Sequence, residues 1–175
     1  GLATTAELVQ ALADPRGWWR MTAQRLLYER QDAASVGPLR ELLRHSSPEA
    51  RVNAVWSLQG LSALSDADLV RVLRDPHQGV RINAMQLAEG RLDANPDLLA
   101  EVIKQAEDED AQVRMQAAFS LGASTSPAAA QALAKLARST QDDVWLRTAV
   151  LSSARELAAE MFVTLLADQS FAPGS

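Results

Sequence analysis

Apolar side chains recur along this 175-residue chain in triplets at positions i, i+3 and i+4, the spacing that places them on one face of an α-helix. Successive triplets begin 29 to 34 residues apart, at Leu8/Ala11/Leu12, Leu39/Leu42/Leu43, Leu69/Val72/Leu73, Leu99/Val102/Ile103, Leu133/Leu136/Ala137 and Phe162/Leu165/Leu166. A nearly constant period of this length is typical of repeat proteins. The pattern therefore predicts one such helix in every repeat.

A second series of short segments alternates with the triplets, and each segment contains an arginine. The segments are WRMTA, ARVNA, VRINA, VRMQA and LRTAV, and their arginines are Arg20, Arg51, Arg81, Arg114 and Arg147. Two interleaved series with nearly the same period indicate two helices per repeat. We expect helical pairs at 4–13 with 15–29, 36–45 with 48–60, 66–74 with 76–90, 96–107 with 110–122 and 127–138 with 142–156. A last helix near 158–169 has no partner.

Prolines and glycines mark the expected ends of these helices. A capping side chain precedes a proline, which favours a helix start, at Asp14-Pro15, Ser47-Pro48, Asp75-Pro76, Asn95-Pro96 and Ser126-Pro127. Gly60, Gly90 and Gly122 fall near the ends of three second helices, where a left-handed residue commonly closes the last turn. No segment combines convincing period-two alternation with enrichment in β-branched residues, so no strand is expected.

These elements predict an all-α fold, an α-solenoid of helical hairpins with about five and a half repeats. One helical pair cannot enclose its own apolar face, and stacking against the next pair buries it. Alanine follows four of the arginines by three residues and lets neighbouring helices approach closely, at Ala23, Ala54, Ala84 and Ala117. We expect a single domain over 1–175, with repeats at 4–30, 35–61, 64–91, 95–123 and 126–157 and a half repeat at 158–169.

Composition excludes several classes of function. The chain has no cysteine, so it holds no disulfide, thiolate metal site, iron–sulfur cluster or covalently attached haem. Its formal charge of −5 is uneven: residues 1–87 carry 10 basic and 9 acidic side chains, whereas residues 88–175 carry 7 and 13. An acidic half repels phosphate, so we expect no nucleic-acid partner. No apolar run approaches the roughly 20 residues of a membrane span, so none is expected in this segment.

Motifs of known catalytic and ligand-binding sites are missing from the sequence. It contains no HExxH, no GxSxG and no glycine-rich phosphate loop. Its two histidines, His45 and His77, fall at expected helix boundaries, where a solvated or capping role is favoured over metal ligation. We therefore expect no catalytic residue, no metal site and no cofactor in this segment.

The arginine series has two interpretations. In three repeats the arginine follows an aspartate by six residues: Arg20 follows Asp14, Arg81 follows Asp75 and Arg114 follows Asp108. Such regularity favours a structural ladder, in which each planar guanidinium bridges the turn of its own repeat to that of the next. The alternative is an anion-binding ridge, which the alternating aspartates would neutralise.

Each tryptophan serves either in binding a partner or in packing between repeats. Trp19 stands directly before its arginine, where the other repeats have Ala50, Val80, Val113 and Leu146, so it is expected in the core between repeats. Trp18 aligns with Glu49, Gly79, Gln112 and Trp145, which indicates an exposed face. Trp18 and Trp145 are therefore the candidate interface residues. Trp56 aligns with Arg25, Gln86, Phe119 and Ser152, which places it at the edge of the stack.

The order Asp-Pro, Val-Arg and then alanine resembles the second helix of a HEAT repeat, as in DPHQGVRINAMQLA. More narrowly, GWWRMTAQRLLYER, ARVNAVWSLQGL and DDVWLRTAVLSSA are similar to the HEAT-repeat region of large bacterial multidomain proteins. These are described as membrane-bound dehydrogenases or haem-binding proteins and are common in planctomycetes and verrucomicrobia. Their repeats lie between a β-propeller and a cytochrome c domain, neither of which is in this sequence. The resemblance implies a connecting module, a fragment of a periplasmic or otherwise exported redox protein.

Two functions remain as hypotheses. The first is a non-catalytic scaffold that binds protein, either the flanking domains of the same protein or a separate partner. The second is a DNA-binding enzyme built on HEAT-like repeats, of the alkylpurine DNA glycosylase type. Such enzymes need a positive surface around DNA, which the charge of this chain opposes.

Overall fold

A computed structural model describes residues 3–139 and 143–167 of the chain. The chain divides into two compact units, 1–84 and 85–175, which meet within helix α6 (Gln78–Ala88). Each unit is described by itself. The expectation of a single domain over 1–175, with the repeat boundaries given above, stays a prediction.

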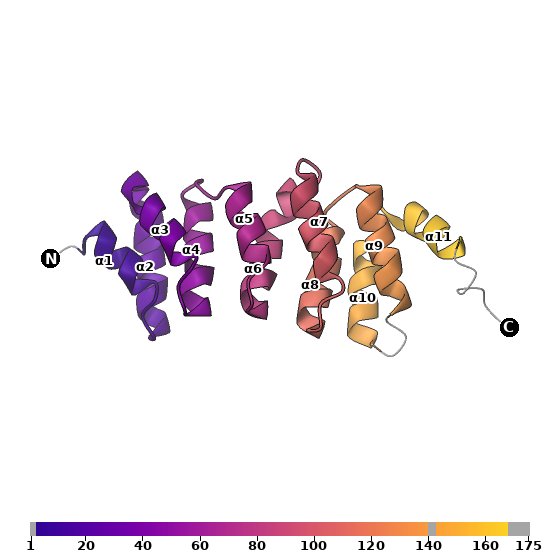
Figure 1. Ribbon diagram of the computed structural model, residues 1–175, viewed down its shortest axis with the longest axis horizontal. Helices are drawn as coiled ribbons and strands as arrows, with labels where there is room; N and C mark the ends of the chain where they lie inside the picture. Colours follow the sequence, from indigo (N-terminus) through magenta and orange to yellow (C-terminus); the bar gives the residue numbers. More distant parts are fainter. Residues whose placement is uncertain (1–2, 140–142, 168–175) are drawn as a thin grey trace. The chain divides into compact units, whose positions relative to one another are not determined.

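The first unit is built from helical hairpins (Figure 1). Its helices are α1 (Thr5–Ala11), α2 (Gly17–Arg30), α3 (Val36–Leu42), α4 (Pro48–Gly60) and α5 (Asp66–Leu73), with a 3-10 turn at Ala33–Ser35 and the start of α6. Helix α1 packs on α2 and α3 packs on α4, while α1 also contacts α3 and α2 contacts α4. First helices therefore form one layer and second helices the other.

The second unit repeats this arrangement. A 3-10 turn at Glu89–Arg91 precedes α7 (Pro96–Gln105), α8 (Ala111–Leu121), α9 (Pro127–Arg138), α10 (Val144–Ser153) and α11 (Ala158–Leu166). Helix α7 packs on α8 and α9 on α10, and the stack continues through contacts of α8 with α10 and of α9 with α11.

The predicted all-α repeat fold is confirmed. Residues 3–139 and 143–167 contain no strand, and each expected helix is present, with bounds that differ by up to three residues. The leading leucines of the triplets, Leu8, Leu39, Leu69, Leu99 and Leu133, are buried. The four alanines of the second helices are buried as well: Ala23, Ala54, Ala84 and Ala117. The period in the sequence therefore reports the stacking of helical hairpins, an α-solenoid fold.

The last triplet behaves differently from the others. Phe162, at the position of the buried Leu133, is 61% exposed, and Val163 and Leu166 of α11 are exposed too. Helix α11 contacts α9, but the residues that the structure describes contain no second helix that pairs with α11.

Two of the five predicted helix starts are wrong. Ser47, Asn95 and Ser126 cap α4, α7 and α9, each with proline in the first turn. Helix α2, however, begins at Gly17 and α6 at Gln78, two residues after Pro15 and Pro76. The reason is that the carboxylates of Asp14 and Asp75 accept hydrogen bonds from the backbone two residues on, which holds Asp-Pro in a turn.

The predicted left-handed glycines are also wrong. Gly60, Gly90 and Gly122 all have φ outside the left-handed region. Within residues 3–139 and 143–167, Gln31 and Ser62 are the residues other than glycine that have positive φ. Two of the glycines instead allow a close approach between second helices. A Cβ at Gly60 would lie 3.0 Å from Cδ2 of Tyr28 on α2, and a Cβ at Gly122 would lie 2.6 Å from Cβ of Ser153 on α10.

Candidate interaction surface

Four arginines of the predicted ladder bind the turn that precedes their own helix. Each donates from Nη1 to two carbonyl oxygens over 2.7–3.2 Å: Arg20 to Asp14 and Pro15, Arg51 to His45 and Ser46, Arg81 to Asp75 and Pro76, Arg114 to Asp108 and Glu109. These carbonyls lie in the turns between helices, where the backbone has few partners of its own. For Arg147, the corresponding residues 141 and 142 lie outside the described residues.

Arg51 also reaches the turn of the next repeat. Arg51 forms a bidentate ion pair with Asp75, in which Nε donates to Oδ2 at 2.6 Å and Nη2 donates to Oδ1 at 2.7 Å. The two side chains are only 10% and 8% exposed. Arg51 thus joins two consecutive turns of the first unit through one guanidinium.

The other two aspartates of the series support their own turns. Asp108 accepts a hydrogen bond from the backbone of Asp110. Asp14 accepts from the backbone of Arg16 and from the Arg16 guanidinium, and these bonds hold the pKa of Asp14 at about 2, below its ordinary value of 3.8.

The predicted burial of Trp19 is wrong. Trp19 is 44% exposed, whereas the aligned Ala50, Val80, Val113 and Leu146 are buried. The indole is larger than these aliphatic side chains, and it lies in the first turn of α2. It makes an edge contact with the Trp18 ring at 4.8 Å, and the Arg16 guanidinium stacks over it at 5.5 Å.

The two candidate interface tryptophans are exposed in the structure. Trp18 is 66% exposed at the start of α2 in the first unit. Trp145 is 79% exposed at the start of α10 in the second unit, beside the exposed Val144. Each lies in the first turn of a second helix, where a partner has access to the ring.

A groove between α2 and α4 is a site that the sequence did not predict. It contains two hollows of about 330 and 300 Å³, and Met21 lines both of them. We call this surface the α2–α4 groove. The hollow nearer the helix starts is bordered by Arg20, Glu49, Asn53 and His77, and the other by Gln24, Arg25, Tyr28, Trp56, Ser57 and Gly60.

Charges balance at the end of the groove near the helix starts. The hydroxyl of Ser47 donates to Glu49 and, with the backbone there, holds the pKa of Glu49 below its ordinary value; Arg20 and His77 lower it further. Glu49 is therefore ionised and offsets the charge of Arg20. His77 accepts a hydrogen bond at Nδ1 from the backbone of Gly79, so it caps its own turn.

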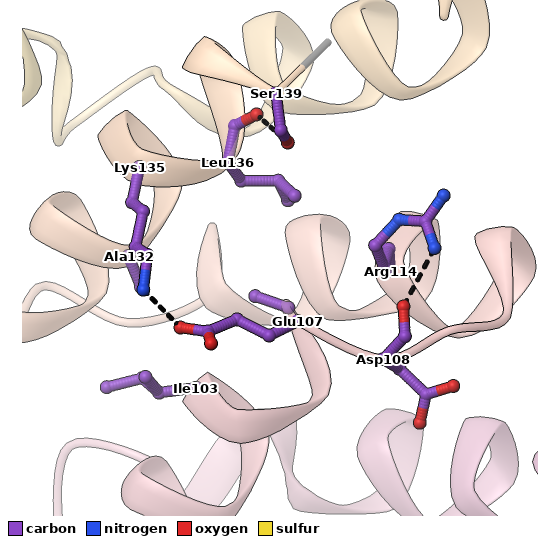
Figure 2. Close-up of a pocket in the computed structure, with 9 residues that line it drawn as sticks. Ile103, Glu107, Asp108, Arg114, Ala132, Lys135, Leu136 and Ser139 are labelled. Atoms are coloured by element: carbon purple, nitrogen blue, oxygen red, sulfur yellow. Dashed lines mark hydrogen bonds and ion pairs between the residues drawn. The ribbon is translucent and has the colours of Figure 1, made fainter.

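The second unit has a hollow of about 390 Å³ between the α7–α8 turn and α9 (Figure 2). Lys135 and Glu107 form an ion pair across it, and Arg114 binds the carbonyl of Asp108 in its wall (Figure 2). These polar groups bind each other and the turn.

Other classes of site are not found in the part of the chain that the structure describes. Residues 3–139 and 143–167 contain no group of three His, Asp or Glu side chains placed to hold a metal ion. Within the same ranges, no helix is long and apolar enough to cross a membrane.

Comparison with known proteins identifies the repeat. The model of HEAT repeats matches residues 5–84 and again residues 67–154. The chain belongs to the HEAT repeat family. No match was found among curated proteins.

Two solved structures share the fold of this HEAT-repeat chain. One is an engineered protein with a TM-score of 0.60 and 18% identity, over 95% of this chain and 85% of that one. The other is a designed armadillo repeat protein in complex with the peptide (KR)4, with a TM-score of 0.55 and 18% identity, over 97% of this chain and 93% of that one. At these identities the likeness concerns the fold alone.

The sequence missed the α2–α4 groove because Tyr28 has no aromatic counterpart in the other HEAT repeats. Counted from the arginine of each repeat, Tyr28 aligns with Gln59, Glu89 and Gly122, whereas Trp56 aligns with Phe119 and Met21 with Met115. A repeat search detects positions that stay the same, whereas a binding face varies from repeat to repeat.

Proposed function

We propose that this HEAT-repeat chain is a non-catalytic scaffold that binds protein through the exposed faces of its second helices. The observation that carries the proposal is the aromatic side chains on those faces: Trp18, Tyr28 and Trp56 in the first unit, and Phe119 and Trp145 in the second. Aromatic residues supply much of the free energy of protein–protein binding. A stack of repeats presents such faces at regular intervals.

The designed armadillo repeat protein supports this function. It shares the fold and was solved in complex with a peptide, (KR)4. Helical repeats of this kind can therefore hold a peptide. At 18% identity the likeness says nothing about the charge of a partner of this chain.

The candidate residues have separate roles in this proposal. Trp18 and Trp145 contact the partner, which is either a flanking domain of the same protein or a separate protein. Arg20, Arg51, Arg81, Arg114 and Arg147, with Asp14, Asp75 and Asp108, form a structural ladder that fixes the turns between helices. The hydrogen bonds of four of these arginines to turn carbonyls support that role.

The scaffold role is tested by recovery of partners. The tagged chain is expressed in its source cells, and co-purifying proteins are quantified for wild type, Trp18→Ala, Trp145→Ala and the control Glu41→Ala. Glu41 is exposed on the first helix α3, so its loss should leave recovery unchanged. We expect at least one tryptophan variant to lose a partner by about tenfold. Equal recovery by all variants, or salt-sensitive binding of duplex DNA without a protein partner, contradicts the scaffold proposal.

We further propose that the chain belongs to a larger exported redox protein, in which it connects or docks the flanking domains. The support is the resemblance of its repeats to those of multidomain bacterial dehydrogenases or haem-binding proteins. Isolation of the native polypeptide with an antibody against this chain tests the proposal. A much larger mass with a haem Soret band is expected. A native chain near 18.9 kDa without a chromophore contradicts it.

A further inference from the structure

Contacts inside the first unit orient the Trp56 side chain in the aromatic half of the α2–α4 groove. The Trp56 indole donates from Nε1 to Oδ1 of Asn83 at 2.7 Å, and Nδ2 of Asn83 donates to the Gly79 carbonyl. The Tyr28 ring lies against Gly60, where an added Cβ would be 3.0 Å from Cδ2 of the ring. The Trp56 indole is thus oriented before a partner arrives, which lowers the entropy lost on binding.

Between these rings lies the hollow of about 300 Å³, open at the surface. Met21 and Tyr28 on its rim are exposed, and Trp56 is partly exposed. Ser57 lines the same hollow, and its hydroxyl is buried without a hydrogen-bond partner. The rim of the hollow therefore presents mainly apolar and aromatic side chains to an occupant.

The residues of α2 that line the hollow are spaced to contact a second helix. Met21, Arg25 and Tyr28 follow one another at i, i+4 and i+7 on α2 and line the hollow over roughly 10 Å of helix axis. A helix that binds in a groove presents anchors at the same spacing. A partner segment of two to three turns therefore spans the groove.

The positive charge of Arg25 favours acidic partners over basic ones. Arg25 is the charged residue that lines this hollow, and helix α2 carries three arginines and one glutamate. The ion pair of Arg25 with Glu29 is 3.4 Å long, with both side chains largely exposed, so it competes weakly with a partner. The groove thus attracts a carboxylate and repels a cation.

We infer that the α2–α4 groove binds an acidic amphipathic helix of a partner protein. An apolar side chain of that helix enters the hollow between Tyr28 and Trp56, and a neighbouring carboxylate binds Arg25. The inference rests on the proposed scaffold function and names the chemistry of one partner and the place where it binds.

A matched pair of synthetic peptides tests the inference. The two peptides, of about 14 residues, share Phe and Leu at helical anchor positions and differ in carrying either Glu or Lys between them. Binding to the full chain is measured by fluorescence anisotropy. We expect the Glu peptide to bind about tenfold more tightly than the Lys peptide. Trp56→Ala should weaken the binding about tenfold. The control Gln131→Ala, exposed on the first helix α9 of the second unit, should not change it.

The charge-reversal variant Arg25→Glu gives the sharpest result. Arg25 is exposed, so the fold of this variant is expected to match wild type by circular dichroism. The variant should reverse the preference and bind the Lys peptide more tightly than the Glu peptide. Equal affinity for both peptides, an unchanged preference in Arg25→Glu, or no binding that depends on Trp56 overturns the inference.

Two further outcomes are distinguished by the same variants. If the chain alone self-associates in sedimentation and Trp56→Ala abolishes this, a second copy occupies the groove and the inference is overturned. If the peptides fail but a partner is still recovered from source cells through Trp18 or Trp145, the inference fails while the scaffold function stands.

Discussion

The buried ion pair of Arg51 and Asp75 is the strongest test of the arginine ladder at the residue scale. Arg51 binds two carbonyls of its own turn and both carboxylate oxygens of Asp75. Arg20 binds two carbonyls in the equivalent turn, but His45 stands where a carboxylate would meet it. The two arginines therefore separate the effect of the turn contacts from that of the ion pair.

Removal of Arg51 should destabilise the chain more than removal of Arg20. Loss of one partner from a buried pair costs about 3–5 kcal/mol, whereas charge-assisted hydrogen bonds are worth about 1.5–3 kcal/mol. Urea unfolding of Arg51→Ala and Arg20→Ala measures the difference. Equal losses would show that the ion pair contributes nothing beyond the turn contacts.

Asp14 should titrate well below an ordinary aspartate. The side-chain hydrogen bond from Arg16 is the largest cause of its lowered pKa of about 2. A carboxyl with a lowered pKa stabilises the fold above its ordinary value of 3.8, and this contribution is lost as the pH falls toward 2. In an NMR titration, Arg16→Ala should move the Asp14 midpoint upward. An unchanged midpoint would contradict the assignment to Arg16.

At the scale of helices, the period of the sequence predicted which segments pair, because buried leucines and alanines recur wherever one hairpin stacks on the next. Exact helix starts depended on local competition instead. Asp14 and Asp75 use their carboxylates to form a turn, whereas Ser47 and Ser126 cap a helix at once. A capping residue followed by proline occurs both where a helix starts at once and where a turn precedes the helix. The sequence alone therefore does not distinguish these two structures.

Trp19 shows a second limit of reasoning from repeats. Its position is buried in four other repeats, but an indole exceeds the space that alanine, valine or leucine fills there. Alignment predicts the direction of a side chain and not its volume. For the same reason the α2–α4 groove was not predicted. The sequence placed Trp56 at the edge of the stack but did not show that Tyr28 lies beside it.

Gly122 provides a test of packing between α8 and α10. A Cβ added there would meet Cβ of Ser153 at 2.6 Å and its Cα and carbonyl oxygen at 2.9 Å, so backbone must move. Gly122→Ala should therefore destabilise the second unit by about 1–3 kcal/mol. Gly90→Ala is the matched control, because nothing lies within 4 Å of its added Cβ. Similar unfolding midpoints for the two variants would show that α8 and α10 separate freely.

At the scale of the whole chain, a family match over residues 5–154 and two fold relatives establish the HEAT-repeat architecture, while the partner follows from surface chemistry. The leading leucines of the first five triplets are buried, the last triplet at Phe162 is exposed, and both units expose aromatic residues on second helices. The regular part of each repeat stabilises the fold, and the variable part is available for recognition. This division explains why the sequence predicted the architecture readily and the binding groove poorly.

Site-specific photocrosslinking in source cells tests the central claim most directly. A photoreactive phenylalanine replaces Tyr28 on the second helix α2 or, as control, Gly37 on the first helix α3, where the side chain has open space. The account predicts a discrete protein adduct from position 28 and none from position 37. Equal adducts from both positions, or none from position 28, would contradict a scaffold that binds protein through its second helices.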